Sequence, residues 1–157
     1  MGKVVTPDSM VRHARRIQRK GGIVVFTNGI FDLLHFGHVS YLQKARQHGH
    51  VLFVGVNTDG STRRLKGKSR PLVRAADRMG TLAALACVDY VTHFDEDTPA
   101  ELIARVKPDV LAKGADYKLA DIVGAKQVKA AGGKIARIKL LPGRSTTDLE
   151  RRIRKMK

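Results

Sequence analysis

Apolar and polar positions follow two different periods along the chain. Short runs of consecutive apolar residues predict buried strands, and apolar residues three or four positions apart predict helices. We expect strands at residues 23–27, 51–56, within 89–94, 109–113 and 134–141. We expect helices within residues 1–20, at 37–47, 75–87, 99–107 and 119–131, and within 145–157. Strand and helix therefore alternate from one end of the chain to the other.

Helix-capping residues support several of these boundaries. Thr6 or Asp8 can cap the first helix, and a pair of glycines at 21–22 can end it. Ser145 or Thr146 can cap the last helix in the same way. The alternation between these caps predicts an α/β fold with five parallel strands covered on both faces. We expect a single doubly wound, Rossmann-like domain over residues 1–157.

The predicted topology also locates the functional loops. Ligands bind such sheets at the carboxyl ends of the strands, where the strand order reverses. The loops at that edge are residues 27–36, 57–71, 113–117 and 142–147. Most of the unusual polar clusters of the sequence fall in these loops, so we expect the binding site there.

Composition and charge narrow the class of protein. The chain has one cysteine, Cys87, no apolar signal-peptide core and no stretch long enough to span a membrane. We therefore expect a cytoplasmic protein without a membrane partner. The net charge of +16 attracts polyanions, which include nucleic acid, nucleotides and sugar phosphates. RNA-binding aromatic signatures and recognition-helix patterns are missing from the sequence, so we expect no nucleic-acid partner.

The loop after the first predicted strand carries the clearest chemistry. The segment Thr27-Asn28-Gly29 can present backbone N–H groups to an anion, and the helix that opens at Gly37 favours a phosphate at its N-terminus. His35 and His38 lie three residues apart and can project into the same site. They can also be ordinary helix-capping and surface histidines, and a zinc site lacks a third ligand nearby. The GxGxxG and P-loop patterns are absent, which argues against a dehydrogenase or a P-loop NTPase.

The segment NGIFDLLHFGH resembles the HxGH signature of the cytidylyltransferase-like nucleotidyltransferases. With VNTDGSTRRLKGKSRP, DRM, VDYV, FDEDTP, KPDVLAKGADY and the late STT, residues 20–154 are similar to one branch of that family. This branch is the D-glycero-β-D-manno-heptose 1-phosphate adenylyltransferases of lipopolysaccharide assembly. Ile30 stands where many members of the branch have cysteine, and Arg144 precedes STT where other branches have a different residue. Many members carry a sugar kinase domain in front. We expect this chain to be a standalone transferase that depends on a separate kinase.

The resemblance implies a reaction and its partners. The sugar 1-phosphate attacks the α-phosphorus of ATP, pyrophosphate leaves, and the product is ADP-heptose. Mg²⁺ would arrive with ATP, held mainly through the phosphates. A homodimer is possible by analogy with the family. Three alternatives stay open: CTP with a polyol or amino-alcohol phosphate, ATP with a flavin nucleotide, and a non-enzymatic basic module that binds nucleic acid.

The resemblance also assigns residues to the site. The catalytic residues would be His35, His38 and Lys66. The nucleotide-binding residues would be Thr27, Asn28, Gly29, His35, Gly37, His38, Gly114, Ser145, Thr146 and Thr147. The substrate-binding residues would be Asp32, Asn57, Asp59, Arg78, Lys113 and Asp116. Simpler roles exist for several of them, since turn carboxylates can fix their own loop and a helix arginine can form a salt bridge.

Overall fold

The structure, a computed structural model, describes residues 2–156. One parallel sheet runs through it in the order β1-β4-β3-β2-β5-β6. Its strands are β1 (Lys3–Val4), β2 (Val24–Gly29), β3 (Val51–Asn57), β4 (Tyr90–Phe94), β5 (Val110–Gly114) and β6 (Lys134–Ile138). The helices are α1 (Pro7–Arg19), α2 (Phe36–Arg46), α3 (Asp59–Lys66), α4 (Ala75–Ala83), α5 (Ala100–Val106), α6 (Ala125–Ala130) and α7 (Thr146–Arg154), with a 3₁₀ turn η1 (Leu119–Asp121).

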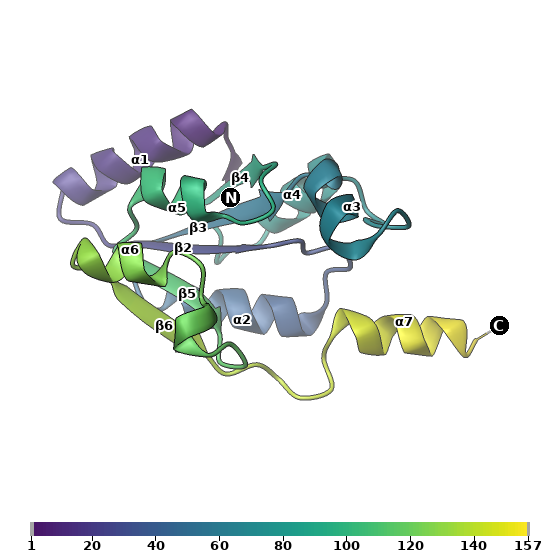
Figure 1. The fold of residues 1–157 in the computed structure, drawn as a ribbon. Helices are drawn as coiled ribbons and strands as arrows, with labels where there is room; N and C mark the ends of the chain where they lie inside the picture. Colours follow the sequence, from purple (N-terminus) through teal and green to yellow (C-terminus); the bar gives the residue numbers. More distant parts are fainter. Residues whose placement is uncertain (1, 157) are drawn as a thin grey trace.

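Helices cover both faces of the sheet, as the sequence predicts. Successive side chains of a strand point to opposite faces. In β2, Val24 and Phe26 pack with α1, α5 and α6, whereas Val25 packs with α2 and α4. Figure 1 shows α1 and α5 above the sheet and α2 below it. Each fully buried side chain of this kind contributes about 1.5–3 kcal/mol. The near-continuous apolar runs of the strands follow from this two-sided burial.

The strand order reverses between β2 and β5. β2 pairs with β3 on one side, where Phe26 is level with Phe53, and with β5 on the other, where Phe26 is level with Leu111. The chain then leaves β2 toward α2 and leaves β5 toward α6, which lie on opposite faces of the sheet. The edge beyond the carboxyl ends of β2 and β5 is therefore the expected ligand site.

The prediction of five strands is wrong by one. The sixth strand, β1, is two residues long and pairs in parallel with β4. Backbone hydrogen bonds from Lys3 to Asp89 and from Val5 to Val91, each 2.9 Å, fix it at the edge. A segment this short shows no period, so a sequence pattern does not reveal it.

Several further segments differ from the predicted elements, among them the predicted strand 134–141, since β6 stops at Ile138. The polar segment 57–71 contains α3, which Thr58 caps by accepting a hydrogen bond from the Ser61 N–H (3.1 Å). The predicted helix 119–131 is divided into η1 and α6 at Gly124, whose φ of 83° no α-helix allows. The predicted helix 75–87 ends earlier, since α4 stops at Ala83. None of the helices within residues 2–156 has the length and apolar character of a membrane span.

Two glycines, Gly80 in α4 and Gly133 just before β6, test how closely the chain is packed at each place. Gly80 lies on the exposed side of the helix, and an added Cβ would meet nothing within 4 Å. Gly80→Ala should raise the free energy of unfolding by about 0.5–1 kcal/mol, because alanine loses less backbone entropy in a helix. Urea titration followed by circular dichroism measures the change. Gly133→Ala is the matched variant in a crowded place: its Cβ would lie 2.7 Å from Val128 Cγ1. We expect a loss of about 1–3 kcal/mol there, and stabilisation by both variants would contradict this description.

Candidate active site

Two joined cavities lie beyond the carboxyl ends of β2 and β5. The larger, about 700 Å³, is lined by polar and charged residues that include Asp32, Asn57 and Lys66. The smaller, about 310 Å³, is lined by the first turn of α2, the segment after β5 and the segment before α7. The cavities share residues 28–31 and several neighbours, so they form one cleft. The structure thus brings together most of the predicted site residues at the predicted edge of the sheet.

Two stacked histidines stand at the N-terminus of α2. The ring centroids of His35 and His38 are 3.9 Å apart with an interplanar angle of 26°. His35 is the N-cap residue, so both rings lie where the free N–H groups of the helix give a positive potential. Phe31 packs its edge against His38 at 5.3 Å and has a φ of 53°, which bulky side chains rarely adopt. The pair is therefore held by its surroundings and does not stand free on the surface.

Both histidines are neutral at pH 7. Burial, with a smaller contribution from His35, lowers the pKa of His38 to about 4, and burial also lowers the pKa of His35. Nδ1 of His38 accepts a hydrogen bond from the His35 N–H (3.4 Å), which assigns the proton of His38 to Nε2. Nδ1 of His35 is buried at the first turn of α2 without a partner among residues 2–156. The positive helix end favours a lone pair there, so His35 too presents an Nε2–H donor.

Close packing of the chain accounts for the glycine at position 37. An added Cβ would lie 2.5 Å from the Arg144 carbonyl oxygen and 2.9 Å from the His35 ring. The segment that precedes α7 therefore crosses directly over the first turn of α2. Only glycine at position 37 allows this approach, which brings the N-terminus of α7 to the cleft.

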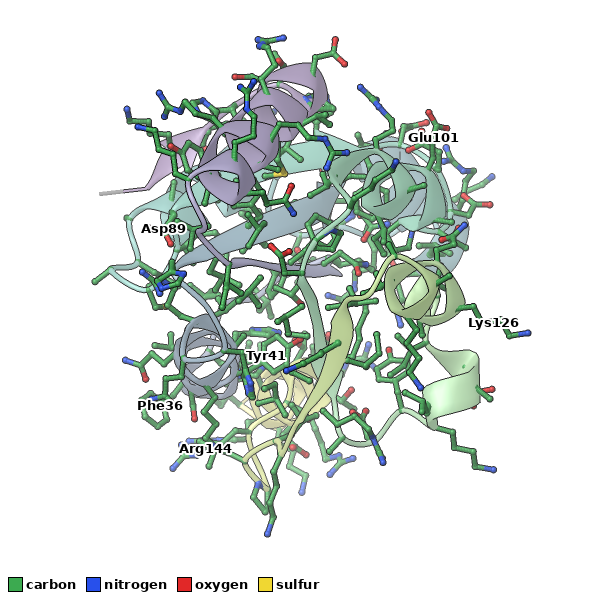
Figure 2. The ribbon with its side chains drawn as sticks, turned by 90° about the vertical axis from the view of Figure 1, so that its left-hand side faces the viewer. Phe36, Tyr41, Asp89, Glu101, Lys126 and Arg144 are labelled. Atoms are coloured by element: carbon green, nitrogen blue, oxygen red, sulfur yellow. The ribbon has the colours of Figure 1, made fainter. Side chains whose placement is uncertain are left out.

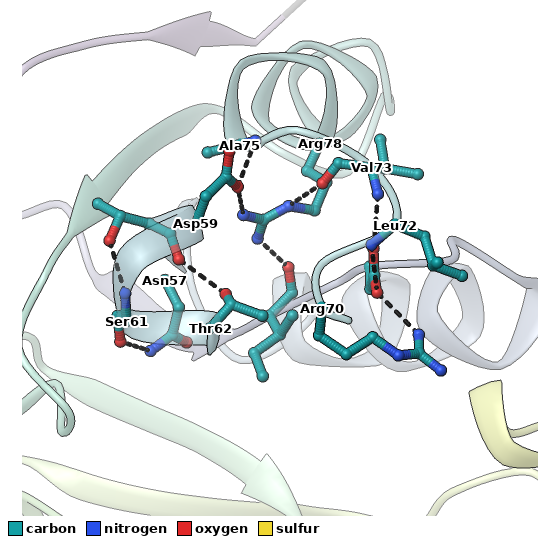
Figure 3. Close-up of polar contacts among 12 residues, drawn as sticks. Asn57, Asp59, Ser61, Thr62, Arg70, Leu72, Val73, Ala75 and Arg78 are labelled. Carbon is teal, nitrogen blue, oxygen red and sulfur yellow. Dashed lines mark hydrogen bonds and ion pairs between the residues drawn. The ribbon is translucent and has the colours of Figure 1, made fainter. Parts of the chain in front are cut away.

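Asp32 anchors the loop that closes the larger cavity. Its carboxylate accepts hydrogen bonds from the Leu72 and Val73 N–H groups (2.8 and 2.9 Å) and pairs with Arg70 at 2.9 Å (Figure 3). Burial alone would raise the pKa of Asp32, but these hydrogen bonds outweigh it and hold the pKa below its ordinary value. Arg70 also pairs with Glu150 of α7. Asp32 therefore fixes the loop of residues 70–73 rather than its own, and it also lines the cavity.

Arg78 and Asp59 lie behind the cleft and bind each other. The Arg78 side chain is 0% exposed and pairs with Asp59 at 2.7 Å (Figure 3). It also donates to the carbonyl oxygens of Val73 and Ile30, and Asp59 accepts from the Ala75 N–H (2.9 Å). These contacts join α3 and α4 to the loop after β2. The predicted contacts of Arg78 and Asp59 with substrate stay predictions. In the structure the two side chains form an ion pair with each other.

The remaining predicted residues divide between the two cavities. Asn57 and Lys66 line the larger one, and the Asn57 amide donates to Ser61 Oγ (2.9 Å). Gly114 and Asp116 line the smaller one, with the Asp116 carboxylate folded over Gly114. Thr27 is buried beneath the site, where its hydroxyl hydrogen-bonds Tyr41 (2.8 Å).

The end of β5 and the start of α7 complete the cleft. Lys113 donates a hydrogen bond to Oδ1 of Asn28, and both line the two cavities. Ser145 caps α7 by accepting from the Asp148 N–H (3.1 Å), as predicted. Thr146 and Thr147 then face the larger cavity.

Tyr41 and Glu150 line the cleft but were not predicted from the sequence, whereas Tyr117, which also lines it, lies in the predicted loop 113–117. Tyr41 lies three residues after His38 on the same side of α2, and Figure 2 shows it directed from α2 toward the sheet. That helical spacing was the available signal for Tyr41. Nothing local in the sequence indicates that Glu150 meets Arg70.

Comparisons with known proteins show which family and which structures the chain is similar to. A family model described as cytidylyltransferase-like matches residues 26–152. The structure is similar to that of the lipopolysaccharide core biosynthesis protein from Thermoplasma volcanium GSS1, with a TM-score of 0.66 and 32% sequence identity. That match covers 77% of this chain and 99% of the other.

Two curated relatives are much longer than this chain. The bifunctional protein HldE of Syntrophotalea carbinolica is 56% identical over 136 residues, which are 87% of this chain and 28% of that protein. The bifunctional protein HldE of Citrifermentans bemidjiense is 50% identical over 151 residues, 96% of this chain and 31% of that protein. The chain spans less than a third of the length of these relatives.

The lowered pKa of His38 predicts a loss of stability in acid. In the unfolded chain the imidazole takes up a proton near its ordinary pKa of about 6.5, whereas in the folded chain it stays neutral down to about 4. The free energy of unfolding should therefore fall as the pH drops from 6.5 to 4, by on the order of 2 kcal/mol from this residue. Urea titrations across this range measure the slope. His38→Gln should have a smaller slope than wild type.

The matched control is His48→Gln, which removes an exposed imidazole just beyond α2. Equal slopes for wild type and His38→Gln would contradict the assignment of a neutral, buried His38.

Proposed function

Since the chain belongs to the cytidylyltransferase-like family and is a nucleotidyltransferase, we propose that it transfers AMP from ATP to D-glycero-β-D-manno-heptose 1-phosphate. The products are ADP-heptose, for lipopolysaccharide core synthesis, and pyrophosphate. The observation that carries the proposal is the pair of neutral, stacked histidines at the N-terminus of α2. The similarity to a lipopolysaccharide core biosynthesis protein supports the sugar pathway.

The two cavities suit the two substrates. The smaller one combines apolar side chains, among them Tyr41, Leu140 and Leu141, with the first turn of α2. That combination suits a nucleoside whose phosphates extend to the helix N-terminus. The larger one, with Asn57 and Lys66, has room and polar groups for a hydroxyl-rich sugar phosphate and for the triphosphate chain of ATP. The reacting phosphates would then meet where the cavities join.

The residues of the cleft act by position and charge. An oxygen of the acceptor phosphate attacks the α-phosphorus in line, and pyrophosphate departs on the opposite side. The Nε2–H groups of His35 and His38 donate to phosphate oxygens, and the positive end of α2 adds to their effect. Lys66, at the end of α3, neutralises the departing pyrophosphate. No covalent intermediate with the protein is needed.

We also propose that Mg²⁺ enters with ATP. Residues 2–156 contain no group of three or more His, Cys, Asp or Glu side chains placed to hold a metal ion. An ion that is held mainly through substrate phosphates and water needs no such group of protein ligands. When bound, such an ion neutralises phosphate charge, and the protein then needs only to orient the complex.

A substrate panel tests the proposed reaction. Pyrophosphate release is measured for ATP and CTP, each with the heptose 1-phosphate, glycerol 3-phosphate and FMN. We expect kcat/KM to be at least about 100-fold higher for ATP with the heptose 1-phosphate than for any other pair, because the polar cavity must be filled by matching hydroxyl groups. Turnover of CTP with glycerol 3-phosphate, and none of ATP with the heptose, would refute the proposal.

Replacing His38 tests the role of the histidine pair. His38→Ala should lower kcat about 100-fold or more, since one oriented donor to a developing charge is worth that much. The circular dichroism spectrum should stay that of wild type, because the ring has a single hydrogen bond within residues 2–156, from the His35 N–H. His48→Ala controls for the loss of an imidazole. Wild-type kcat in His38→Ala would show that the ring takes no part in transfer.

A further inference from the structure

Lys113 stands where the two cavities join. Both cavities are lined by residues 28–31, His38, Lys113, Tyr117 and Thr146. His38 is neutral at pH 7, so Lys113 carries the formal charge of this shared set. It comes from the carboxyl end of β5, beside β2, and a buried strand holds its backbone in place.

The Lys113 ammonium has capacity for a further acceptor. It donates one hydrogen bond, to Oδ1 of Asn28, and takes part in none of the ion pairs found within residues 2–156. Two of its three N–H groups therefore remain for a ligand. Burial lowers the pKa of Lys113 to about 8, so the group is still protonated at pH 7. A sequestered cation without a carboxylate partner is costly unless an anion joins it.

We propose that Lys113 is a catalytic residue of nucleotidyl transfer, which binds the phosphate oxygens of both substrates at the junction. The inference rests on the proposed reaction in this cleft and deepens it. The two substrates are both anions, and two unit charges 4 Å apart repel by about 4 kcal/mol at an effective dielectric constant of 20. A cation between them offsets this repulsion at the point where the new bond forms.

The chemical step balances without proton transfer. A nonbridging oxygen of the acceptor phosphate forms a bond to the α-phosphorus. The bond from that phosphorus to the bridging oxygen breaks, and its electron pair leaves with pyrophosphate. The attacking oxygen is already ionised at neutral pH, so Lys113 keeps its proton and acts through its charge.

One substitution and its control separate the charge of Lys113 from its place in the fold. Lys113→Gln keeps a donor for Asn28 but removes the charge, and we expect kcat to fall about 100-fold. The melting temperature should be equal to that of wild type or higher, because an uncompensated charge is removed. Lys126→Gln is the matched control. It removes the same charge from α6, away from α2 (Figure 2), and should leave kcat unchanged.

The pH profile provides a second readout. Wild-type kcat/KM should fall as the pH rises through about 8, where Lys113 loses its proton. Lys113→Arg keeps its charge, so the fall should move to higher pH. The other titratable groups that line the two cavities with Lys113, or lie beside it on β6, are Asp32, His35, His38, Tyr41, Lys66, Arg70, Asp97, Asp116, Tyr117, Arg137, Arg144 and Glu150. Burial lowers the pKa of His38 and raises that of Tyr41, so neither produces a fall near pH 8.

The assays use the triphosphate and acceptor that wild type converts fastest. If that fastest pair is not ATP with the heptose 1-phosphate, the proposed substrate assignment is refuted. The test of Lys113 is still valid, because it uses whichever pair reacts. Calorimetric titration with inorganic pyrophosphate tests the charge without turnover, and we expect at least about 10-fold weaker binding to Lys113→Gln. A kcat within about threefold of wild type, or an equal loss in Lys126→Gln, would overturn the proposal.

Discussion

Because β2 lies between β3 and β5, the loops that follow β2 and β5 turn to opposite faces of the sheet and leave the strand ends open between them. The whole cleft depends on this pairing. Asn28 and Lys113 meet there because the register of β2 and β5 brings the ends of these strands together. The stacked histidines follow from the same constraint, since α2 begins at the opening. A shift in that register would separate the two cavities.

The basic side chains in and behind the cleft have two different roles. Arg70 and Arg78 are paired with carboxylates, and their contacts hold the loops that form the walls. Lys66 and Lys113 face the cavities and are absent from the ion pairs found within residues 2–156. The paired arginines thus provide shape, and the lysines provide charge for ligands. The net charge of +16 adds a long-range attraction for polyanionic substrates.

The features of the structure that depend on neighbouring residues can be predicted from the sequence. Apolar runs identify β2 and β3 because both faces of these strands are buried, and the HxGH spacing places both histidines at one helix end. β1 stays hidden because its two residues show no period, and its pairing is set by a distant strand. The pairing of Arg78 with Asp59, and of Arg70 with Glu150, depends on tertiary approach between distant residues. Such contacts leave no mark on neighbouring positions, so these residues resemble ordinary loop and helix charges.

The division between neutral and charged donors has a catalytic reason. A cleft lined entirely by cations would bind ATP strongly before reaction, and binding that is equal in ground and transition states does not raise kcat. Neutral imidazoles orient the phosphates through hydrogen bonds and hold pyrophosphate less tightly after it leaves. Under the proposal, full charge is concentrated at Lys113, where the two anions must approach each other. Partial burial at the end of β5 keeps that charge effective, because the surrounding protein screens it less than bulk water does.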